Sequence, residues 1–180
     1  MRAGGIRNQR WISTLGRFLR PDLFLESVYA IDPEKLRRRG IRGLVFDLDM
    51  TLVEWMEQRP SPRLAGWLGN LSGQGFRMCI LSNNSHQRVR SFAAAVGVPA
   101  ISWAGKPLAR SYRRAMRLMG TTPATTAAVG DQVFTDVWGG NRLHLFTILV
   151  LPLGRRQSPH TRFLRHLERW VLRGVEVRHS

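Results

Sequence analysis

The chain has 180 residues and carries 28 Lys and Arg against 12 Asp and Glu, which gives a formal net charge of +16. This length suits one domain with short appendages, and the 43% of hydrophobic residues excludes a globally disordered chain. The single cysteine, Cys79, excludes an internal disulfide framework or a cysteine-based zinc cluster, while the positive excess predicts an anionic partner: nucleic acid, anionic lipid or a phosphorylated substrate.

Strand-like and helix-like segments alternate between residues 40 and 151. In chain order we predict a strand at 41–47, a helix at 61–71, a strand at 76–82, a helix at 87–96, a strand at 99–103, a helix at 107–119, a strand at 124–130, a short helix at 134–141 and a strand at 145–151. The strands are continuous apolar runs, which is typical of a parallel sheet covered on both faces. We therefore predict an α/β fold with a central parallel sheet of about five strands flanked by helices.

Basic amphipathic stripes flank this alternating region. At helical spacing they comprise Trp11, Ile12, Leu15, Phe18 and Leu19 near one end, and Phe163, Leu164, Leu167, Trp170 and Val171 near the other. Arginines accompany both stripes, so they suit either contact with an anionic membrane or packing on the domain with solvated arginines. We divide the chain into a basic amphipathic N-terminal helical segment (1–39), a core (40–153) and a basic amphipathic C-terminal helix (154–180).

A third basic feature lies inside the core. Arg110, Arg113, Arg114 and Arg117 are spaced along one face of the predicted helix 107–119, with Tyr112, Ala115, Met116 and Met119 on the face toward the sheet. A solvated helix face explains this spacing, and a track for lipid headgroups or RNA is the alternative.

Aspartates gather where predicted strands end. Asp47 and Asp49 leave the first strand two residues apart, and Asp131 and Asp136 follow the strand 124–130. Because ligands bind at the carboxyl ends of strands in open parallel sheets, we expect these side chains to share one pocket. Hard oxygen ligands without His or Cys indicate Mg²⁺. Asp136 also suits a helix cap.

Other polar groups fall at the same edge. Ser82 and Asn83 close the second strand and offer a hydroxyl, an amide and backbone N–H groups to a phosphate. Lys106 supplies a compact cation; only Lys35 and Lys106 are lysines among the 28 cations, so a lysine here suggests a requirement for a point charge rather than a solvated surface cation. Beside these groups, the paired carboxylates of Asp47 and Asp49 suit a nucleophile next to a proton donor.

These motifs resemble those of the haloacid dehalogenase (HAD) phosphatases: DLDMT at 47–51, LSNN at 81–84, GK at 105–106 and GDQVFTD at 130–136. The resemblance implies a Rossmann-like HAD fold and roles for the matching residues. Asp47 becomes the nucleophile that forms an aspartyl-phosphate, and Asp49 the acid and base. Thr51 and Ser82 hold phosphoryl oxygens and Lys106 neutralises charge. Mg²⁺ is held by Asp47, the backbone carbonyl of Asp49 and Asp131, with support from Asp136.

At a finer level, the segments 21–53, 81–84, 104–107, 129–142 and 147–153 resemble the YqeG-type subclass IIIA phosphatases, a group similar to the mitochondrial and plastid phosphatidylglycerophosphate phosphatases. Met50 departs from the pattern, which usually has Asn there. We expect this change to alter hydrogen bonding in the loop rather than to abolish activity.

The spacing of the motifs leaves no room for a cap domain, which favours a large or surface-bound phosphate ester. We expect an Mg²⁺-dependent phosphomonoester hydrolase, cytoplasmic and peripheral on the inner face of the membrane, acting on phosphatidylglycerophosphate in phospholipid biosynthesis. We expect neither a secretory signal nor a membrane span, since no apolar run approaches about 20 residues. Two alternatives stay open: a HAD phosphatase for a nucleic-acid end, nucleotide or phosphoprotein, and a basic RNA- or ribosome-associated protein with a vestigial HAD core. The oligomeric state stays unassigned.

Overall fold

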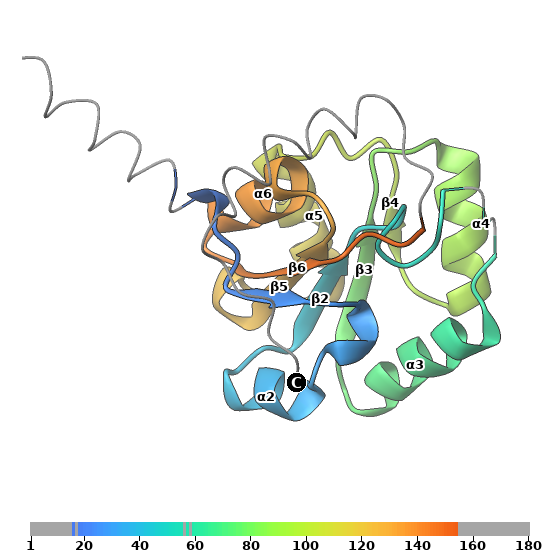
Figure 1. Cartoon of the computed structure of the whole chain (residues 1–180), viewed down its shortest axis with the longest axis horizontal. Coiled ribbons are helices and arrows are strands. Elements are labelled where there is room, and N and C mark those ends of the chain that lie inside the picture. Colours follow the sequence, from blue (N-terminus) through green and yellow to red (C-terminus); the bar gives the residue numbers. More distant parts are fainter. Residues whose placement is uncertain (1–15, 17, 56, 58, 155–180) are drawn as a thin grey trace, which may run out of the picture.

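The computed structural model describes residues 16, 18–55, 57 and 59–154. Their strands form one six-stranded parallel sheet in the order β1-β6-β5-β2-β3-β4 (Figure 1). The strands are β1 (Leu23–Leu25), β2 (Gly43–Phe46), β3 (Arg77–Leu81), β4 (Ala100–Ile101), β5 (Thr126–Gly130) and β6 (Phe146–Val150). The predicted α/β fold with a parallel sheet is confirmed.

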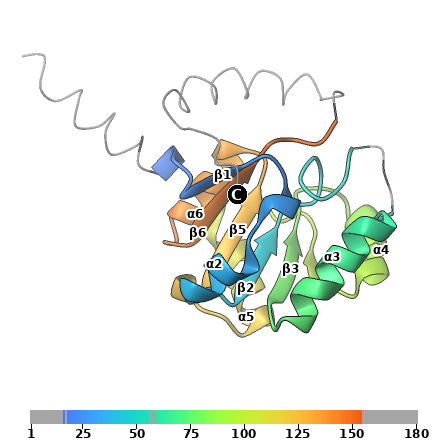
Figure 2. The ribbon, with the colours of Figure 1, turned by 60° about the horizontal axis from the view of Figure 1, so that its bottom comes forward.

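Helices cover both faces of the sheet. They are α2 (Pro33–Arg38), α3 (Pro62–Gly73), α4 (His86–Val96), α5 (Ala109–Met119) and α6 (Trp138–Asn141). Side chains alternate along β2: Leu44 and Phe46 join a core cluster with residues of α2, α3 and α4, while Val45 joins a second cluster with residues of α5. Figure 2 shows α3 and α4 side by side on their face of the sheet. Burial on both faces explains why the strands are continuous apolar runs.

Local signals set where the long helices begin and end. The Ser61 hydroxyl accepts a hydrogen bond from the backbone N–H of Leu64 at 3.2 Å, and Pro62 follows it at the first helical position of α3. Both α4 and α5 end at a glycine with left-handed backbone, Gly97 and Gly120. Each glycine ends its helix before the chain turns toward the next strand of the sheet.

A strand that the sequence analysis did not predict lies at one edge of the sheet. β1 has three residues and pairs with β6, so the sheet has six strands rather than about five. Asp22 anchors it: its carboxylate accepts hydrogen bonds from the backbone N–H and the hydroxyl of Thr147, at 2.8 and 3.1 Å. The sheet therefore begins before residue 40, inside the segment that we set apart from the core.

The terminal stripes lie mostly outside the described residues. Residues 1–15 and 155–180 are not among them, so the predicted terminal helices and the boundary at residue 153 stay predictions. Leu19, the last member of the N-terminal stripe, packs against a cluster of Val133, Val137 and Leu149. No helix in the part of the chain that the structure describes combines the length and apolar character needed to cross a bilayer.

The two places where a cap domain can be inserted hold short connections. The described residues between β2 and α3 form a loop, and those between β3 and Lys106 form α4, β4 and loops. Within the described chain there is no cap domain, as the motif spacing predicted. None of the described residues forms a cap over the edge of the sheet that carries the carboxyl ends of the strands.

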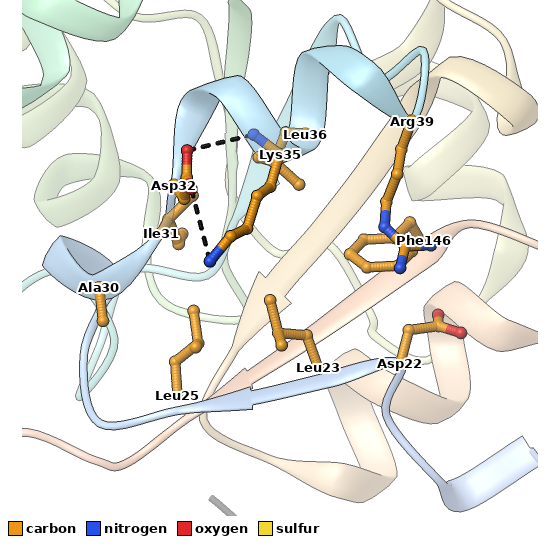
Figure 3. Close-up of a pocket in the computed structure, with 10 residues that line it drawn as sticks. All are labelled: Asp22, Leu23, Leu25, Ala30, Ile31, Asp32, Lys35, Leu36, Arg39 and Phe146. Carbon is orange, nitrogen blue, oxygen red and sulfur yellow. Dashed lines mark hydrogen bonds and ion pairs between the residues drawn. The ribbon is translucent and has the colours of Figure 1, made fainter. Parts of the chain in front are cut away.

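A cavity of about 350 Å³ lies between β1, α2 and the start of β6 (Figure 3). Leu25, Ile31 and Leu36 are among its apolar walls, and the Arg39 guanidinium stacks over the Phe146 ring at 5.0 Å. None of the predicted site residues lines it, so this cavity is separate from the chemistry described below.

Replacing Asp22 by Ala removes the acceptor for the Thr147 N–H, and we expect the free energy of unfolding to fall by about 1 kcal/mol. Asp22→Asn keeps an acceptor oxygen and is the matched control, with a smaller loss. Urea denaturation followed by circular dichroism measures both. Equal stability of the Ala variant and the unmodified chain would show that the β1 anchor contributes nothing.

Candidate active site

The predicted site residues meet at the carboxyl edge of the sheet. Asp47 directly follows β2, Ser82 follows β3 and Asp131 follows β5. β2 and β5 are neighbours in the sheet, and the chain builds β3 and β4 on one side of β2 but β5 and β6 on the other. This reversal of strand order is where open α/β sheets form their binding crevice. A pocket of about 210 Å³ opens there, lined in part by Asp47, Asp49, Ser82, Asn83 and Lys106.

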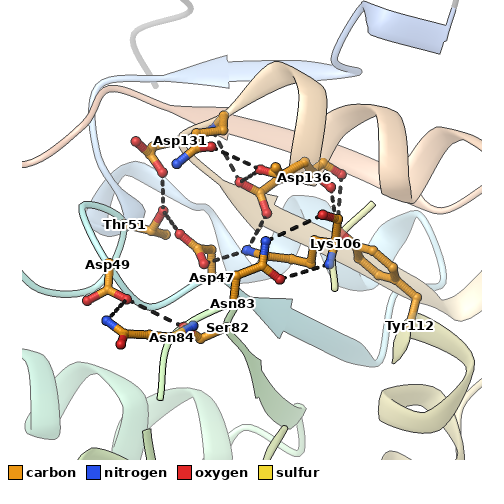
Figure 4. Close-up of polar contacts among 12 residues, drawn as sticks. Asp47, Asp49, Thr51, Ser82, Asn83, Asn84, Lys106, Tyr112, Asp131 and Asp136 are labelled. Atoms are coloured by element: carbon orange, nitrogen blue, oxygen red, sulfur yellow. Dashed lines mark hydrogen bonds and ion pairs between the residues drawn. The ribbon is translucent and has the colours of Figure 1, made fainter. Parts of the chain in front are cut away.

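Lys106 is the centre of the polar network in Figure 4. Its ammonium nitrogen donates to Asp47 Oδ1 at 2.5 Å and to Asp136 Oδ1 at 2.7 Å. All three side chains are buried. This burial excludes the alternative that Lys106 is a solvated surface cation, and the lysine directly neutralises the carboxylate expected to be the nucleophile.

Burial and charge act on these groups in opposite senses. Burial raises the pKa of the Asp47 carboxyl, and the Lys106 ammonium opposes that rise without cancelling it. Burial acts to lower the pKa of Lys106, but the carboxylates of Asp136 and Asp47 outweigh it and raise that pKa. The lysine therefore stays protonated beside these carboxylates.

Three carboxylates form a group that suits a divalent metal ion. Asp47, Asp131 and Asp136 each offer an oxygen, these oxygens lie within 4.8 Å of one another, and all three residues are buried. Counted as formal charges, three carboxylates against one ammonium leave an excess of two negative charges. Buried carboxylate oxygens are the ligands that hard divalent cations prefer, so the residues present fit such an ion. The Asp49 carboxylate is not part of this group among the described residues.

The Thr51 hydroxyl lies between two of these acids. Its oxygen is 3.3 Å from Asp47 Oδ2 and 3.3 Å from Asp131 Oδ1. Thr51 is almost fully buried, so its position is set by packing as well as by these contacts. Its predicted contact with a phosphoryl oxygen stays a prediction.

Asp49 is held by a different set of partners. Its Oδ2 accepts from the Ser82 hydroxyl at 3.4 Å and from the Asn84 amide at 3.1 Å. Its Oδ1 pairs with the Arg88 guanidinium at 2.8 Å. Two carboxylates only two residues apart thus have separate surroundings, Asp47 with Lys106 and Asp49 with Arg88, as two different chemical roles require.

The Asn83 side chain lines the pocket and also contacts the protein backbone. Its Oδ1 accepts from the Lys106 N–H at 2.8 Å, and its Nδ2 donates to the Lys106 carbonyl at 3.4 Å. These bonds hold the loop 102–108, which carries Lys106 and is called the lysine loop, beside the end of β3. Phosphate binding by Asn83 stays a prediction, and the observed contacts give its amide a positioning role.

Asp136 lies in a π-helical turn, Val133–Val137, which replaces the first half of the predicted helix 134–141. Its Oδ2 accepts from the Gln132 N–H and the Thr135 hydroxyl, both at 3.2 Å. The Tyr112 hydroxyl donates to the Thr135 carbonyl at 2.9 Å and supports this turn from α5. The alternative role of Asp136 as a simple helix cap does not explain its ion pair with Lys106.

Met50 occupies a position with left-handed backbone, φ +68°. Asn tolerates this conformation better than other non-glycine residues, which gives a physical reason for the Asn that the family pattern has there. The Met50 backbone remains bonded, because its N–H donates to the Val53 carbonyl at 2.7 Å and its carbonyl accepts from the Leu153 N–H at 2.8 Å.

Sequence reasoning missed several residues of the site. Asn84 and Arg88 hold Asp49, Tyr112 supports the turn of Asp136, and Trp55 and Trp103 line the pocket. Arg88 follows Asn84 by one helical turn, and this spacing was the one available signal. The pairing with Asp49 depends on the packing of α4 against the loop after β2, which no local pattern reveals.

The lack of a side chain at Gly130 makes room for Asp136. A Cβ at this position would lie 2.2 to 2.5 Å from atoms of the Asp136 side chain, so Gly130→Ala must displace a carboxylate that three groups hold. We expect the free energy of unfolding to fall by about 1–3 kcal/mol.

Gly69→Ala is the matched control, because Gly69 lies in α3 with nothing within 4 Å of the added Cβ. The same chemical change should there raise the free energy of unfolding by about 0.5–1 kcal/mol. Chemical denaturation of both variants tests the pair. A Gly130→Ala variant as stable as Gly69→Ala would contradict the tight packing of Asp136.

The comparisons with known proteins agree with this geometry. A family model described as haloacid dehalogenase-like hydrolase matches residues 20–144. The Bacillus subtilis protein named "Probable phosphatase YqeG" is 40% identical over 90% of this chain and 94% of its own length. The chloroplastic/mitochondrial phosphatidylglycerophosphate phosphatase 1 of Arabidopsis thaliana is 30% identical over 91% of this chain, which spans about half (52%) of that protein.

A solved structure with the same fold is the cobalt-bound deoxy-D-mannose-octulosonate 8-phosphate phosphatase of Haemophilus influenzae. The TM-score is 0.50 at 16% identity, over 77% of this chain and 90% of that one. The sheet, the acids at its carboxyl edge and the extent of both sequence matches agree, so the chain belongs to the haloacid dehalogenase-like hydrolase family, as a phosphatase of the YqeG type.

Proposed function

We propose that this phosphatase is an Mg²⁺-dependent phosphomonoester hydrolase that works through an aspartyl-phosphate on Asp47. The observation that carries the proposal is the buried Asp47 carboxylate, bonded to Lys106 and open to a pocket at the carboxyl edge. A carboxylate in this position is desolvated, oriented and within reach of a phosphate in that pocket.

The first step forms a bond between an Asp47 carboxylate oxygen and phosphorus, and the bond from phosphorus to the ester oxygen breaks. Asp49 gives a proton to the departing oxygen. In the second step Asp49 takes a proton from water as that water attacks phosphorus, which releases inorganic phosphate and restores Asp47. Lys106 offsets the negative charge that gathers around phosphorus, as positioned cations do in phosphoryl transfer.

The Mg²⁺ ion would be held by the carboxylates of Asp47 and Asp131, the backbone carbonyl of Asp49 and, in support, Asp136. When bound, it supplies positive charge that draws a phosphate toward Asp47 and offsets the charge of the transferring group. The excess of carboxylates over ammonium groups in the cluster supports this assignment.

For the substrate we propose an anionic phospholipid with a terminal phosphate, phosphatidylglycerophosphate, in phospholipid biosynthesis. Two observations support it: the name of the Arabidopsis relative, and a pocket of about 210 Å³ that takes a phosphate headgroup but not a whole lipid. The net charge of +16 favours peripheral contact with an anionic membrane, and we place the protein on the cytoplasmic, inner face.

A second candidate function rests on the arginine stripe of α5. Arg110, Arg113, Arg114 and Arg117 are exposed, while Tyr112, Ala115, Met116 and Met119 face the sheet, as the helical spacing predicted. A basic helix face near the site suits a phosphate backbone, so a phosphatase for a nucleic-acid end or nucleotide is the alternative. Phosphoproteins, which also carry phosphate monoesters, are a further class of possible substrate.

A substrate panel separates these candidates. We expect phosphate release from phosphatidylglycerophosphate in vesicles to exceed release from a 5′-phosphorylated oligonucleotide, a nucleoside monophosphate and a phosphopeptide by about tenfold or more in kcat/KM. Asp47→Asn, which keeps the side-chain volume, should lower turnover by about 10³-fold or more, with an unchanged circular dichroism spectrum. Preference for the oligonucleotide would favour the second candidate, and turnover retained by Asp47→Asn would refute the aspartyl-phosphate.

Metal dependence has its own test. We expect chelation with EDTA to stop phosphate release and added Mg²⁺ to restore it, whereas Ca²⁺ should not, since it requires more ligands at longer distances. Asp131→Asn should raise the Mg²⁺ concentration needed for half-maximal rate by about tenfold or more. Full activity after exhaustive chelation would rule out the metal.

A further inference from the structure

Two exposed tryptophans flank the pocket that holds Asp47. Trp55 lies on the loop after β2 and is 52% exposed, and Trp103 lies on the loop after β4 and is 68% exposed. Both line the pocket, so a phosphate that reaches Asp47 enters beside these two rings. Large exposed aromatic side chains are costly in water, which calls for an explanation at this place in the fold.

The other exposed apolar side chains gather at the same edge of the sheet. The described residues include five large hydrophobic side chains with high exposure: Trp55, Trp103, Leu108, Leu118 and Leu151. Leu108 lies on the lysine loop and Leu151 directly follows β6, so four of the five lie at the carboxyl edge. Leu118 is the exception, near the far end of α5.

Trp103 is also held in place. Its backbone is left-handed, with φ +47°, an unfavourable conformation for an aromatic residue that persists only where the surroundings impose it. The Trp103 N–H donates to the Asn84 carbonyl at 3.1 Å, and the next N–H, of Ala104, donates to the Ser82 carbonyl at 3.0 Å. The backbone at Trp103 is thus fixed relative to Ser82 and Asn84, which hold Asp49.

We propose that Trp55 and Trp103 dock the open edge of the site onto the interface of an anionic phospholipid bilayer, with the pocket mouth facing the lipid. Trp is enriched at this depth of a membrane because its ring is apolar and its N–H is polar. The pocket is too small for acyl chains, so a lipid phosphate must be reached where the lipid lies. The proposal rests on the lipid substrate proposed above.

The charged side chains near Trp55 do not form the proposed docking surface; the overall charge of the chain acts at longer range. Glu54 and Glu57 lie on the same loop as Trp55 and are exposed, and the Arg88 guanidinium bonds the Glu54 carbonyl at 3.2 Å. The overall charge of +16 attracts the protein to an anionic bilayer at long range. The local contact is then apolar, and it sets which face of the molecule meets the lipid.

The test uses the full chain and the double variant Trp55→Ala/Trp103→Ala. The first measurement is phosphate release from phosphatidylglycerophosphate in anionic vesicles, compared with release from p-nitrophenyl phosphate in solution. We expect the loss on vesicles to exceed the loss in solution by about tenfold or more, as for removal of an aromatic anchor at an interface. Leu118→Ala, with a side chain of matched exposure (53%) away from the pocket, should leave both rates unchanged.

The second measurement is quenching of tryptophan fluorescence by brominated phospholipid in anionic vesicles without substrate. We expect the unmodified chain to be quenched more than the double variant, because the two rings enter the interface. Equal losses on vesicles and in solution would overturn the proposal in favour of direct ring contact with the substrate, and unchanged vesicle turnover or equal quenching would also overturn it.

The lipid substrate and the docking surface can be refuted independently of each other. If the unmodified chain does not hydrolyse the lipid at all, the lipid substrate is wrong, and quenching alone then decides the docking surface. Quenching that requires Trp55 and Trp103 would keep the docking surface without that substrate.

Discussion

The buried ammonium group of Lys106 is the contact on which the catalytic centre depends. It joins Asp47, at the end of β2, to Asp136, in the turn after β5, and so ties together three segments far apart in the sequence. Buried charges are costly unless each finds a partner, and removal of one member leaves the others unpaired in a poor solvent. The surrounding contacts serve this group: Asn83 bonds the Lys106 backbone, and Gly130 leaves room for Asp136.

The same group explains the division of labour between the two acids of the first motif. One ammonium does not balance the formal charges of three carboxylates, so the cluster of Asp47, Asp131 and Asp136 suits a divalent cation. Asp49 points to Arg88 instead, outside that cluster. The metal-binding chemistry and the proton transfer proposed above thus use separate electrostatic surroundings, although the two carboxylates are two residues apart.

Much of the site was predictable because its residues follow parallel strands, whose carboxyl ends meet at one edge by the geometry of the fold. Asp47, Ser82, Lys106 and Asp131 were placed this way, before any contact was known. β1 was missed because a strand of three residues is too short to show a periodic pattern of apolar side chains. Its position depends on Asp22 and Thr147, which are 125 residues apart. The same limit hid the pair of Arg88 with Asp49. The sequence analysis predicted one helix at 134–141, where the structure has a π-helical turn at Val133–Val137 followed by α6, and the local apolar pattern does not separate the two kinds of helix.

Attraction to an anionic surface and contact with it use different parts of this molecule. The arginine stripe begins at Arg110, close to the lysine loop, and Arg117 lies about 10 Å farther along α5, toward the opposite edge of the sheet. Interactions of exposed charges fade beyond about 8 Å at physiological ionic strength, so this term depends on salt. The apolar side chains at the carboxyl edge act only in contact and depend little on salt. In the proposed mode of action, charge therefore governs how often the protein reaches a membrane, while Trp55 and Trp103 govern whether the pocket faces the lipid once it is there.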